Sequence, residues 1–213
     1  MSAERSSIAA LFGSQRVVPV IEVHDVAATI HAVQALVDGG LAIVEIVMRT
    51  PVALDAIEAV RREVPAAVVG AGTVRTAAHW HAAVDAGAQF IVSPGTTTDL
   101  YRTAARSPIP FLPGIATVSE ALEALRRGHS TVKLYPAALL GGIAMIDAMA
   151  SVMGGAVSFV PTGGLAADDV GRYLALAAVL AVGGSFACPA KLVETQDWAA
   201  ISARARQFAR WSL

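Results

Sequence analysis

AIVEIVMR, residues 42–49, is a short apolar run that lies between Gly-Gly-Leu and Thr-Pro. Its near-continuous Ile and Val are typical of strands in parallel sheets, which are buried on both faces. Seven similar runs occur elsewhere in the chain: VVPVIEV (17–23), AAVVGAGT (66–73), QFIVSPG (89–95), PFLPG (110–114), TVKLYPA (131–137), VSFVPTGG (157–164) and VLAVGGS (179–185). The sequence therefore predicts eight buried, parallel strands.

The segments between these runs have the apolar spacing of helices. In PVALDAIEAVRREVP (51–65), apolar residues fall at 52, 56, 57 and 60, on one helical face. Eight strand–helix units in 213 residues predict an α/β fold, a (β/α)8 TIM barrel formed by one domain over residues 1–213. Residues 1–16 are predicted to add an N-terminal helix that covers the bottom of the barrel. An open doubly wound sheet is the alternative fold.

Gly, Pro, Thr and Ser cluster where the predicted strands end, in GAGT, SPG, LPG, YPA, PTGG and GGS. The loops at this end of a barrel form its active site, and glycine lets the backbone approach a ligand closely. Glycine pairs at 163–164 and 183–184 follow strands seven and eight. In many barrels these two loops bind phosphate through backbone N–H groups, so a phosphate site is predicted here.

The composition excludes several other classes of protein. Hydrophobic residues make up 55% of the chain and charged residues 15%, which excludes disorder, and the net charge of −1 provides no basic patch for nucleic acid or a membrane surface. The single cysteine, Cys188, cannot form an internal disulfide and is expected to be a buried apolar residue, as in a reducing cytoplasm. No targeting segment is apparent, so a soluble cytoplasmic protein is predicted. His79 and His81 face different ways on a helix, so no metal and no other cofactor is expected.

Lysine is scarce, with only Lys133 and Lys191 among 16 basic residues. Lys191 is predicted to lie solvated in a polar loop. Lys133 lies inside an apolar strand, where a buried ammonium is costly unless it is paired or deprotonated. A desolvated lysine can attack a carbonyl as the free amine, whereas a structural lysine would only extend to the barrel mouth.

The strand at 42–49 adds two charges to this region. Glu45, Val47 and Arg49 are two residues apart, so their side chains point to one face of the strand. We expect that face to be the barrel interior, with Arg49 at the mouth. Glu45, Arg49 and Lys133 together would form a site that balances its own charges and binds a substrate carboxylate through Arg49.

The sequence, including these residues, resembles the 2-keto-3-deoxy-6-phosphogluconate (KDPG) aldolases, also called bifunctional 4-hydroxy-2-oxoglutarate aldolases. The resemblance covers almost the whole chain, through VVPVI, ALVDGGLAIVEIVMRT, VVGAGTV, AGAQFIVSPG, PFLPGIATVSE, VKLYPA, FVPTGG and AVGGSF. It implies a metal-free class I lyase that forms a Schiff base and cleaves the phosphorylated keto acid to pyruvate and glyceraldehyde 3-phosphate. It also implies a homotrimer.

The resemblance assigns roles to particular residues. Lys133 of the K-x-x-P-A strand would form the Schiff base, and Glu45 would be the proton shuttle. Arg49 and Thr73 would hold the pyruvyl carboxylate. Pro94 and Tyr135 would line the pyruvyl pocket, and the family usually has phenylalanine at the position of Tyr135. The phosphate site would consist of Gly163, Gly164, Gly184 and Ser185.

The chain departs from this family after the lysine strand. The family commonly continues as PAE, whereas this chain reads PAALLGGIAMIDAMASVMGG, with Asp147 as the single charge. A helix over 138–153 would carry apolar residues most of the way round, which predicts an additional interface with another chain. The alternative is that this helix packs beneath loops of its own chain.

Two alternative functions are considered beside KDPG cleavage. A close aldolase would act on the galactonate epimer or on non-phosphorylated 4-hydroxy-2-oxoglutarate. In a different class, a self-assembling scaffold would use the apolar helix and retain the aldolase site without needing it.

Overall fold

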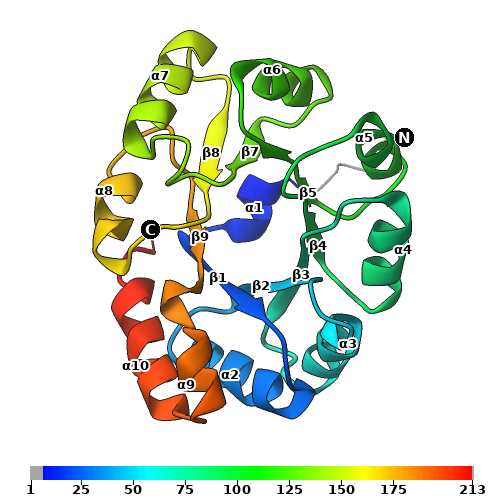
Figure 1. Cartoon of the computed structure of the whole chain (residues 1–213), viewed down its shortest axis with the longest axis vertical. Helices are drawn as coiled ribbons and strands as arrows, with labels where there is room; N and C mark the ends of the chain where they lie inside the picture. Colours follow the sequence, from blue (N-terminus) through cyan, green and yellow to red (C-terminus); the bar gives the residue numbers. More distant parts are fainter. Residues whose placement is uncertain (1–6, 213) are drawn as a thin grey trace.

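The computed structural model describes residues 7–212. Figure 1 shows strands around the centre of the molecule, helix α1 within them, and the other helices around the outside. The strands are β1 (Val17–Glu22), β2 (Ile43–Val47), β3 (Val68–Gly72), β4 (Phe90–Val92), β5 (Phe111–Leu112), β6 (Gly114–Ile115), β7 (Thr131–Leu134), β8 (Ser158–Pro161) and β9 (Val182–Gly184). The helices are α1 (Ile8–Phe12), α2 (Val26–Asp38), α3 (Ala53–Glu63), α4 (Ala77–Asp85), α5 (Thr98–Ala105), α6 (Val118–Arg126), α7 (Ile143–Met153), α8 (Val170–Leu174), α9 (Ala190–Glu194) and α10 (Trp198–Ala209), with 3₁₀ turns η1 (Ala167–Asp169) and η2 (Ser185–Ala187).

All strand pairs are parallel, as the buried apolar runs predict. One sheet has the order β5-β4-β3-β2-β1-β9, and the other has the order β6-β7-β8. Bridges from Phe159 to Val179 and from Thr162 to Gly183 join the chain around β8 to the chain around β9. The result is a curled α/β sheet with its connecting helices on the outer side.

The run PFLPG (110–114) is two short strands, β5 and β6, rather than the single strand that the sequence predicts. Pro113 lies between them and has no N–H to donate to a strand ladder. A side chain links β6 to the residue after β4 at this point, because the Ser93 hydroxyl accepts a hydrogen bond of 3.0 Å from the Gly114 N–H. Thr96 donates to the Gly114 carbonyl at 3.0 Å, so the loop after β4 is fixed beside β6.

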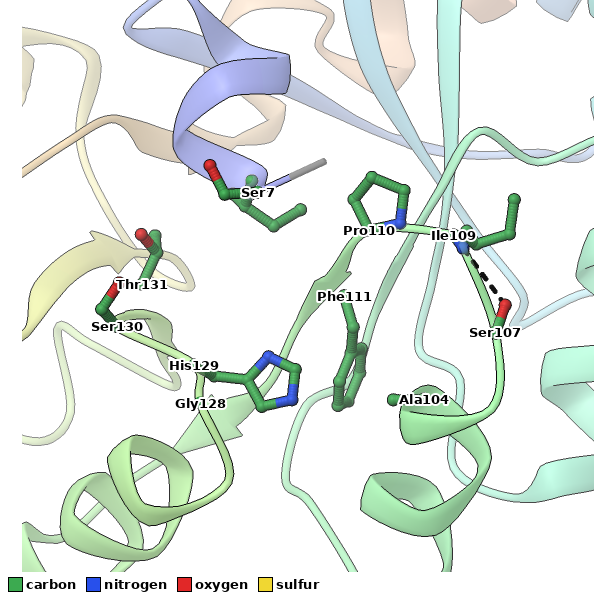
Figure 2. Close-up of a pocket in the computed structure, with 11 residues that line it drawn as sticks. Ser7, Ala104, Ser107, Ile109, Pro110, Phe111, Gly128, His129, Ser130 and Thr131 are labelled. Atoms are coloured by element: carbon green, nitrogen blue, oxygen red, sulfur yellow. Dashed lines mark hydrogen bonds between the residues drawn. The ribbon is translucent and has the colours of Figure 1, made fainter. Parts of the chain in front are cut away.

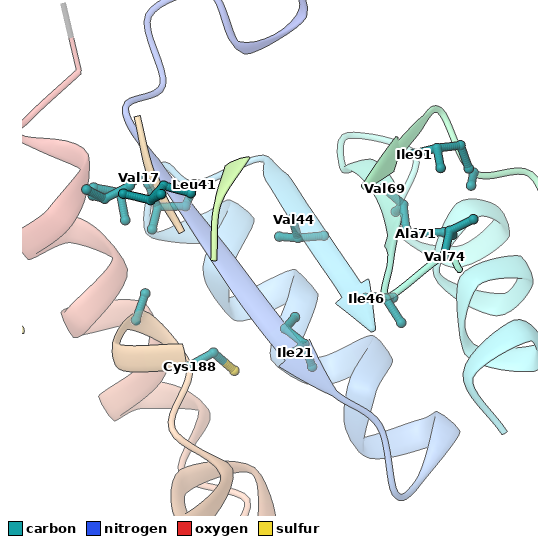
Figure 3. Packing of buried hydrophobic residues seen from close by; sticks show 14 of the residues in the cluster. Val17, Ile21, Leu41, Val44, Ile46, Val69, Ala71, Val74, Ile91 and Cys188 are labelled. Carbon is teal, nitrogen blue, oxygen red and sulfur yellow. The ribbon is translucent and has the colours of Figure 1, made fainter. Parts of the chain in front are cut away.

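Side chains alternate along the strands between two apolar clusters. The outward cluster, which packs against the helices, includes Val17, Ile21, Val44 and Ile46 (Figure 3). The inward cluster consists of Val18, Ile43, Phe90, Val92, Leu112, Val160 and Ala181, together with Ile8 and Phe12 of α1. The Phe12 and Phe90 rings meet edge to face at 5.7 Å, so α1 closes the amino end of the sheet interior.

Helix α1 is shorter than the helix predicted over residues 1–16. It covers Ile8–Phe12 and ends at Gly13, whose φ of 52° does not continue a helix. The chain then returns to the sheet through Gln15, whose side-chain amide donates to the carbonyls of Val17 and Ile43 at 2.8 Å each. The part of the prediction on residues 1–6 lies outside the described residues.

Several helices begin with a polar cap. The side chains of Asp25, Thr76, Thr97, Thr117 and Asp197 each accept a hydrogen bond from a backbone N–H in the first turn of the helix that follows. Such caps satisfy donors that have no partner within the helix. They help to fix the points at which these five helices begin.

The apolar segment 138–153 differs from its prediction, because helix α7 begins only at Ile143. Gly141 and Gly142 have φ values of 101° and 59°, so the preceding residues form turns. Ile146, Met149 and Met153 are buried, and Leu140, Ile143 and Met145 are partly buried and pack against the core. Leu139 and Val152 remain 86% and 67% exposed. The segment therefore packs largely on its own chain, and only two of its large apolar residues face outward.

Lys191 is exposed as expected, but it lies in helix α9 rather than in a loop. Among residues 7–212, no helix has both the length and the apolar character that crossing a membrane requires.

Candidate active site

A cavity of about 510 Å³ opens at the carboxyl ends of the strands. Its lining comes from β1, β2, β7, β8 and β9 and the loops after them: Val20, Ile21, Glu22, His24, Val47, Arg49, Lys133, Tyr135, Thr162, Gly163, Gly164, Leu165, Gly184, Ser185, Cys188, Ala190 and Val193. A second cavity, of about 110 Å³, lies at the amino ends of β5 and β7 and is lined by Phe111, His129 and small polar residues (Figure 2). The larger cavity contains most of the residues that the sequence proposes for a site.

Lys133 and Glu45 form a buried ion pair beneath this cavity. The Lys133 Nζ lies 2.9 Å from Glu45 Oε1 and 3.3 Å from Oε2. The two side chains are only 6% and 4% exposed. Glu45 therefore points inward, as its spacing with Val47 and Arg49 predicts. A buried ion pair is expensive to desolvate and contributes little net stability, so its presence is more readily explained by chemistry than by folding.

Gly72 makes room for the Glu45 carboxylate. A Cβ atom added at Gly72 would overlap Glu45 Oε1. The two residues come from neighbouring strands, since Val47 of β2 is in register with Gly72 of β3. The glycine of GAGT therefore allows the carboxylate to lie against the backbone of β3 and reach Lys133.

Arg49 lies at the cavity mouth and is paired with Glu22 of β1. Its Nη1 is 3.3 Å from Glu22 Oε2, and the other carboxylate oxygen of Glu22 is 3.6 Å from His24 Nε2. The side chains of Arg49 and Glu22 are 46% and 42% exposed. Arg49 and Lys133 thus each have a carboxylate partner.

Sequence reasoning identified Arg49 but missed Glu22 and His24. The signal was present in VVPVIEV, because Val18, Val20 and Glu22 alternate with Val17 and Ile21 as Glu45 does with its neighbours. Val18 belongs to the inward cluster, so the same face of β1 carries Glu22 at its carboxyl end.

Gly163 and Gly164, together with Gly184 of the second glycine pair, line the cavity. Gly163 and Gly164 have φ values of 97° and 75°, a conformation that other residues rarely adopt. A Cβ at Gly163 would come within 3.0 Å of the Tyr135 ring. This ring lies beside the buried amine, with its centroid 5.7 Å from Lys133 Nζ. The backbone at Gly163, Gly164, Gly184 and Ser185 is thus brought to the same cavity as Lys133.

Thr73 and Pro94 are not among the residues that line this cavity. Thr73 directly follows β3, with a φ of 60°, and is half-buried. The Pro94 backbone packs so closely on Gly114 that a Cβ there would overlap it, and Gly114 is in register with Lys133. Both residues therefore lie at the carboxyl ends of strands, but on the β3–β6 side, whereas the cavity extends toward β8 and β9.

Cys188 lies on the cavity wall and is buried, as expected of a small apolar residue. Burial raises the pKa of its thiol to about 12. The thiol is therefore protonated near neutral pH and is a poor nucleophile. Within residues 7–212, no group of three His, Cys, Asp or Glu side chains is arranged to hold a metal ion.

A buried amine hydrogen-bonded to a carboxylate, at the carboxyl ends of parallel strands, is the arrangement of an enzyme that acts on carbonyl compounds. The chain matches the KDPG and KHG aldolase family over residues 8–204. It is 39% identical to the KHG/KDPG aldolase of Escherichia coli K12 over 203 residues, which is 95% of each chain.

Two solved structures are similar throughout. The KDPG aldolase of Zymomonas mobilis ZM4 with 3-phosphoglycerate has a TM-score of 0.92 at 38% identity, with 98% of this chain and 97% of that chain covered. The KDPG aldolase of Legionella pneumophila, with pyruvate captured at low pH as a covalent carbinolamine intermediate, has a TM-score of 0.90 at 38% identity, with 94% and 97% covered. The chain belongs to the KDPG and KHG aldolase family.

Proposed function

We propose that this protein is a metal-independent class I aldolase that cleaves 2-keto-3-deoxy-6-phosphogluconate to pyruvate and glyceraldehyde 3-phosphate. The observation that carries the proposal is the buried contact of 2.9 Å between Glu45 Oε1 and the Nζ of Lys133, which lines the large cavity. Family membership supports it, and so does the carbinolamine that pyruvate forms in the Legionella relative.

The reaction begins with the amine. Lys133 transfers a proton to Glu45 and, as the free amine, attacks the C2 ketone of the substrate to give a carbinolamine. The protonated Glu45 returns the proton to the C2 hydroxyl, which leaves as water, and an iminium ion remains. The iminium is the electron sink for the next step.

Carbon–carbon cleavage uses the same carboxylate. Glu45 removes the proton of the C4 hydroxyl, the C3–C4 bond breaks, and its electrons move into the iminium to give an enamine. Glyceraldehyde 3-phosphate leaves. The enamine is protonated at C3, and addition of water to the resulting iminium releases pyruvate and restores Lys133. One buried carboxylate thus serves as acid and base in turn.

The rest of the site holds the two ends of the substrate. Arg49 and Thr73 bind the C1 carboxylate, the arginine through its forked N–H donors. Pro94 and Tyr135 enclose the pyruvyl group. The backbone N–H groups around Gly163, Gly164, Gly184 and Ser185 bind the phosphate, as loops at this position do in many barrels.

We also propose that the fold is a complete (β/α)8 barrel, in which β5 and β6 together occupy one strand position and α1 is an additional N-terminal helix. The bridges between the chain around β8 and β9 support closure of the sheet. The whole chain acts as one domain, and the family match over residues 8–204 supports this assignment. We propose a homotrimer in the cytoplasm, with Leu139 and Val152 at a contact between chains.

The alternative functions are less well supported. A scaffold does not need a costly buried ion pair, and the relatives that the chain resembles over most of its length are named as enzymes. The same names favour the gluconate over the galactonate epimer. The Escherichia coli relative is named for both substrates, and we propose that 4-hydroxy-2-oxoglutarate is a second substrate here.

The test is an assay of KDPG cleavage. We expect pyruvate and glyceraldehyde 3-phosphate in equal amounts, at a rate that exhaustive chelation does not reduce. Lys133→Gln should abolish cleavage, whereas Lys191→Gln, the same change at an exposed site, should leave it intact. No cleavage by the folded wild-type protein would contradict the proposal, and loss to chelation with rescue by a divalent cation would indicate a class II aldolase.

A further inference from the structure

Glu22 is a charged residue that the mechanism above does not use, although it lies at the cavity mouth. It is the last residue of β1 and shares the inward face of that strand with Val18 and Val20. Its two oxygens face different partners, Oε2 at 3.3 Å from Arg49 Nη1 and Oε1 at 3.6 Å from His24 Nε2. Glu22 is therefore already paired with Arg49, the cation to which the substrate carboxylate would bind.

We propose that Glu22 sets the affinity of the carboxylate site: it competes with the substrate carboxylate for Arg49 and so weakens the binding of pyruvate and of the keto-acid end of the substrate. The inference rests on the proposed function, because it takes Arg49 as the carboxylate site. It assigns Glu22 an effect on affinity and no part in bond breaking.

The geometry favours competition between Glu22 and the substrate for Arg49 over the alternative that Glu22 holds Arg49 in position for the substrate. The Glu22–Arg49 contact is a single one of 3.3 Å, not the short bidentate pair by which carboxylates hold arginine rigidly. Both side chains are nearly half exposed, and exposed pairs order their partners weakly. A bound carboxylate beside Arg49 would face the negative charge of Glu22, so the two anions oppose each other there.

His24 gives Glu22 a second polar neighbour. Its Nε2 lies 3.6 Å from Oε1, whereas Arg49 contacts the other oxygen, Oε2. Glu22 can therefore give up Arg49 to a ligand and keep a polar neighbour. Competition of this kind suits an enzyme whose product, pyruvate, carries the same carboxylate as its substrate, because weaker binding speeds product release.

The test compares Glu22→Gln with Glu63→Gln. Glu63 is a matched control, because it is 45% exposed and pairs with Arg62 at 2.7 Å on the outer helix α3. Both changes remove one negative charge, but only the first removes it from the cavity mouth. The readouts are the pyruvate concentration that half-saturates the borohydride-trapped adduct, and KM and kcat for KDPG.

We expect Glu22→Gln to lower the half-saturating pyruvate concentration and the KM by about two- to fivefold, the range of an exposed charge pair, with no rise in kcat. Glu63→Gln should change neither. A higher half-saturating concentration in Glu22→Gln would show that Glu22 braces Arg49, and an equal fall in both variants would show only a net-charge effect; either overturns the inference while leaving the aldolase assignment in place. If the wild-type protein forms no adduct, the proposed function fails and this inference fails with it.

Discussion

At the scale of single residues, strand periodicity predicted that Glu45 faces inward, and its place in an apolar strand singled out Lys133. Glu45 and Lys133 were expected to be inward and close, and their side chains meet in a buried contact of 2.9 Å. The same periodicity would have found Glu22, whose neighbours in VVPVIEV alternate in the same way. Thr73 and Pro94 came from family resemblance alone, and local spacing could not show on which side of the barrel mouth the cavity opens.

Glu45→Gln tests the proton shuttle. The amide keeps a hydrogen-bond acceptor near Lys133 but cannot take up a proton, so kcat should fall by ~10²–10⁴-fold. The pyruvate adduct should still form, but more slowly, because water must then take the proton from Lys133. Steady-state kinetics and adduct mass measure the two effects separately. Glu58→Gln, on the exposed face of α3, is the control. Unchanged turnover in Glu45→Gln would assign this carboxylate to structure.

Cys188 should resist alkylation. Because burial raises the pKa of its thiol to about 12, almost none of it is thiolate at pH 8. Iodoacetamide at pH 8 should therefore leave the folded protein unmodified by mass and label it once after unfolding in denaturant. Rapid labelling of the folded protein would mean that the thiol is accessible and ionised at the cavity wall.

At the scale of elements, two of the differences from the predicted strands and helices occur where proline or glycine interrupts an apolar run. The run 110–114 was expected to be one strand, but Pro113 divides it. The segment 138–153 was expected to be one helix, but the positive φ values of Gly141 and Gly142 delay its start to Ile143. Both differences arise because backbone restrictions at single residues override an apolar pattern.

Gly72→Ala tests the contact between β3 and the reactive carboxylate. The added methyl group would overlap Glu45 and push it from Lys133, so kcat should fall at least tenfold, and stability should fall by about 1–3 kcal/mol from overpacking. Gly95→Ala is the control, because a Cβ there meets nothing within 4 Å. Thermal unfolding and KDPG kinetics measure both effects. Normal kinetics in Gly72→Ala would show that Glu45 can react from another position.

The outward residues around α7 test the contact between chains. Leu139 and Val152 are 86% and 67% exposed, so charge introduced there should weaken association without disturbing the chain's own core. We expect the wild-type protein to have about three times the 21.9 kDa chain mass by light scattering, and Leu139→Glu/Val152→Glu to have less. Leu122→Glu on α6, at a position 53% exposed, should retain the wild-type mass. An unchanged mass in the double variant would place the interface elsewhere.

At the scale of the whole molecule, alternation of buried runs and helical segments was enough to predict parallel strands with surrounding helices. It also predicted that ligand-binding loops gather at the carboxyl ends of the strands, where the 510 Å³ cavity opens. The shape of that cavity could not be predicted, because it depends on how side chains from five strands and their loops pack together. The placement of α1 inside the amino end likewise depends on long-range contacts such as that between Phe12 and Phe90.

The most direct test of the central claim is to trap the Schiff base in the wild-type protein. Removal of Lys133 would leave Glu45 buried without its partner and destabilise the chain, so labelling the intact site is the cleaner measurement. Treatment with pyruvate and borohydride should add one reduced adduct by intact mass, and peptide mapping should place it on Lys133. An adduct on Lys191 alone, or none on the folded protein, would contradict the account.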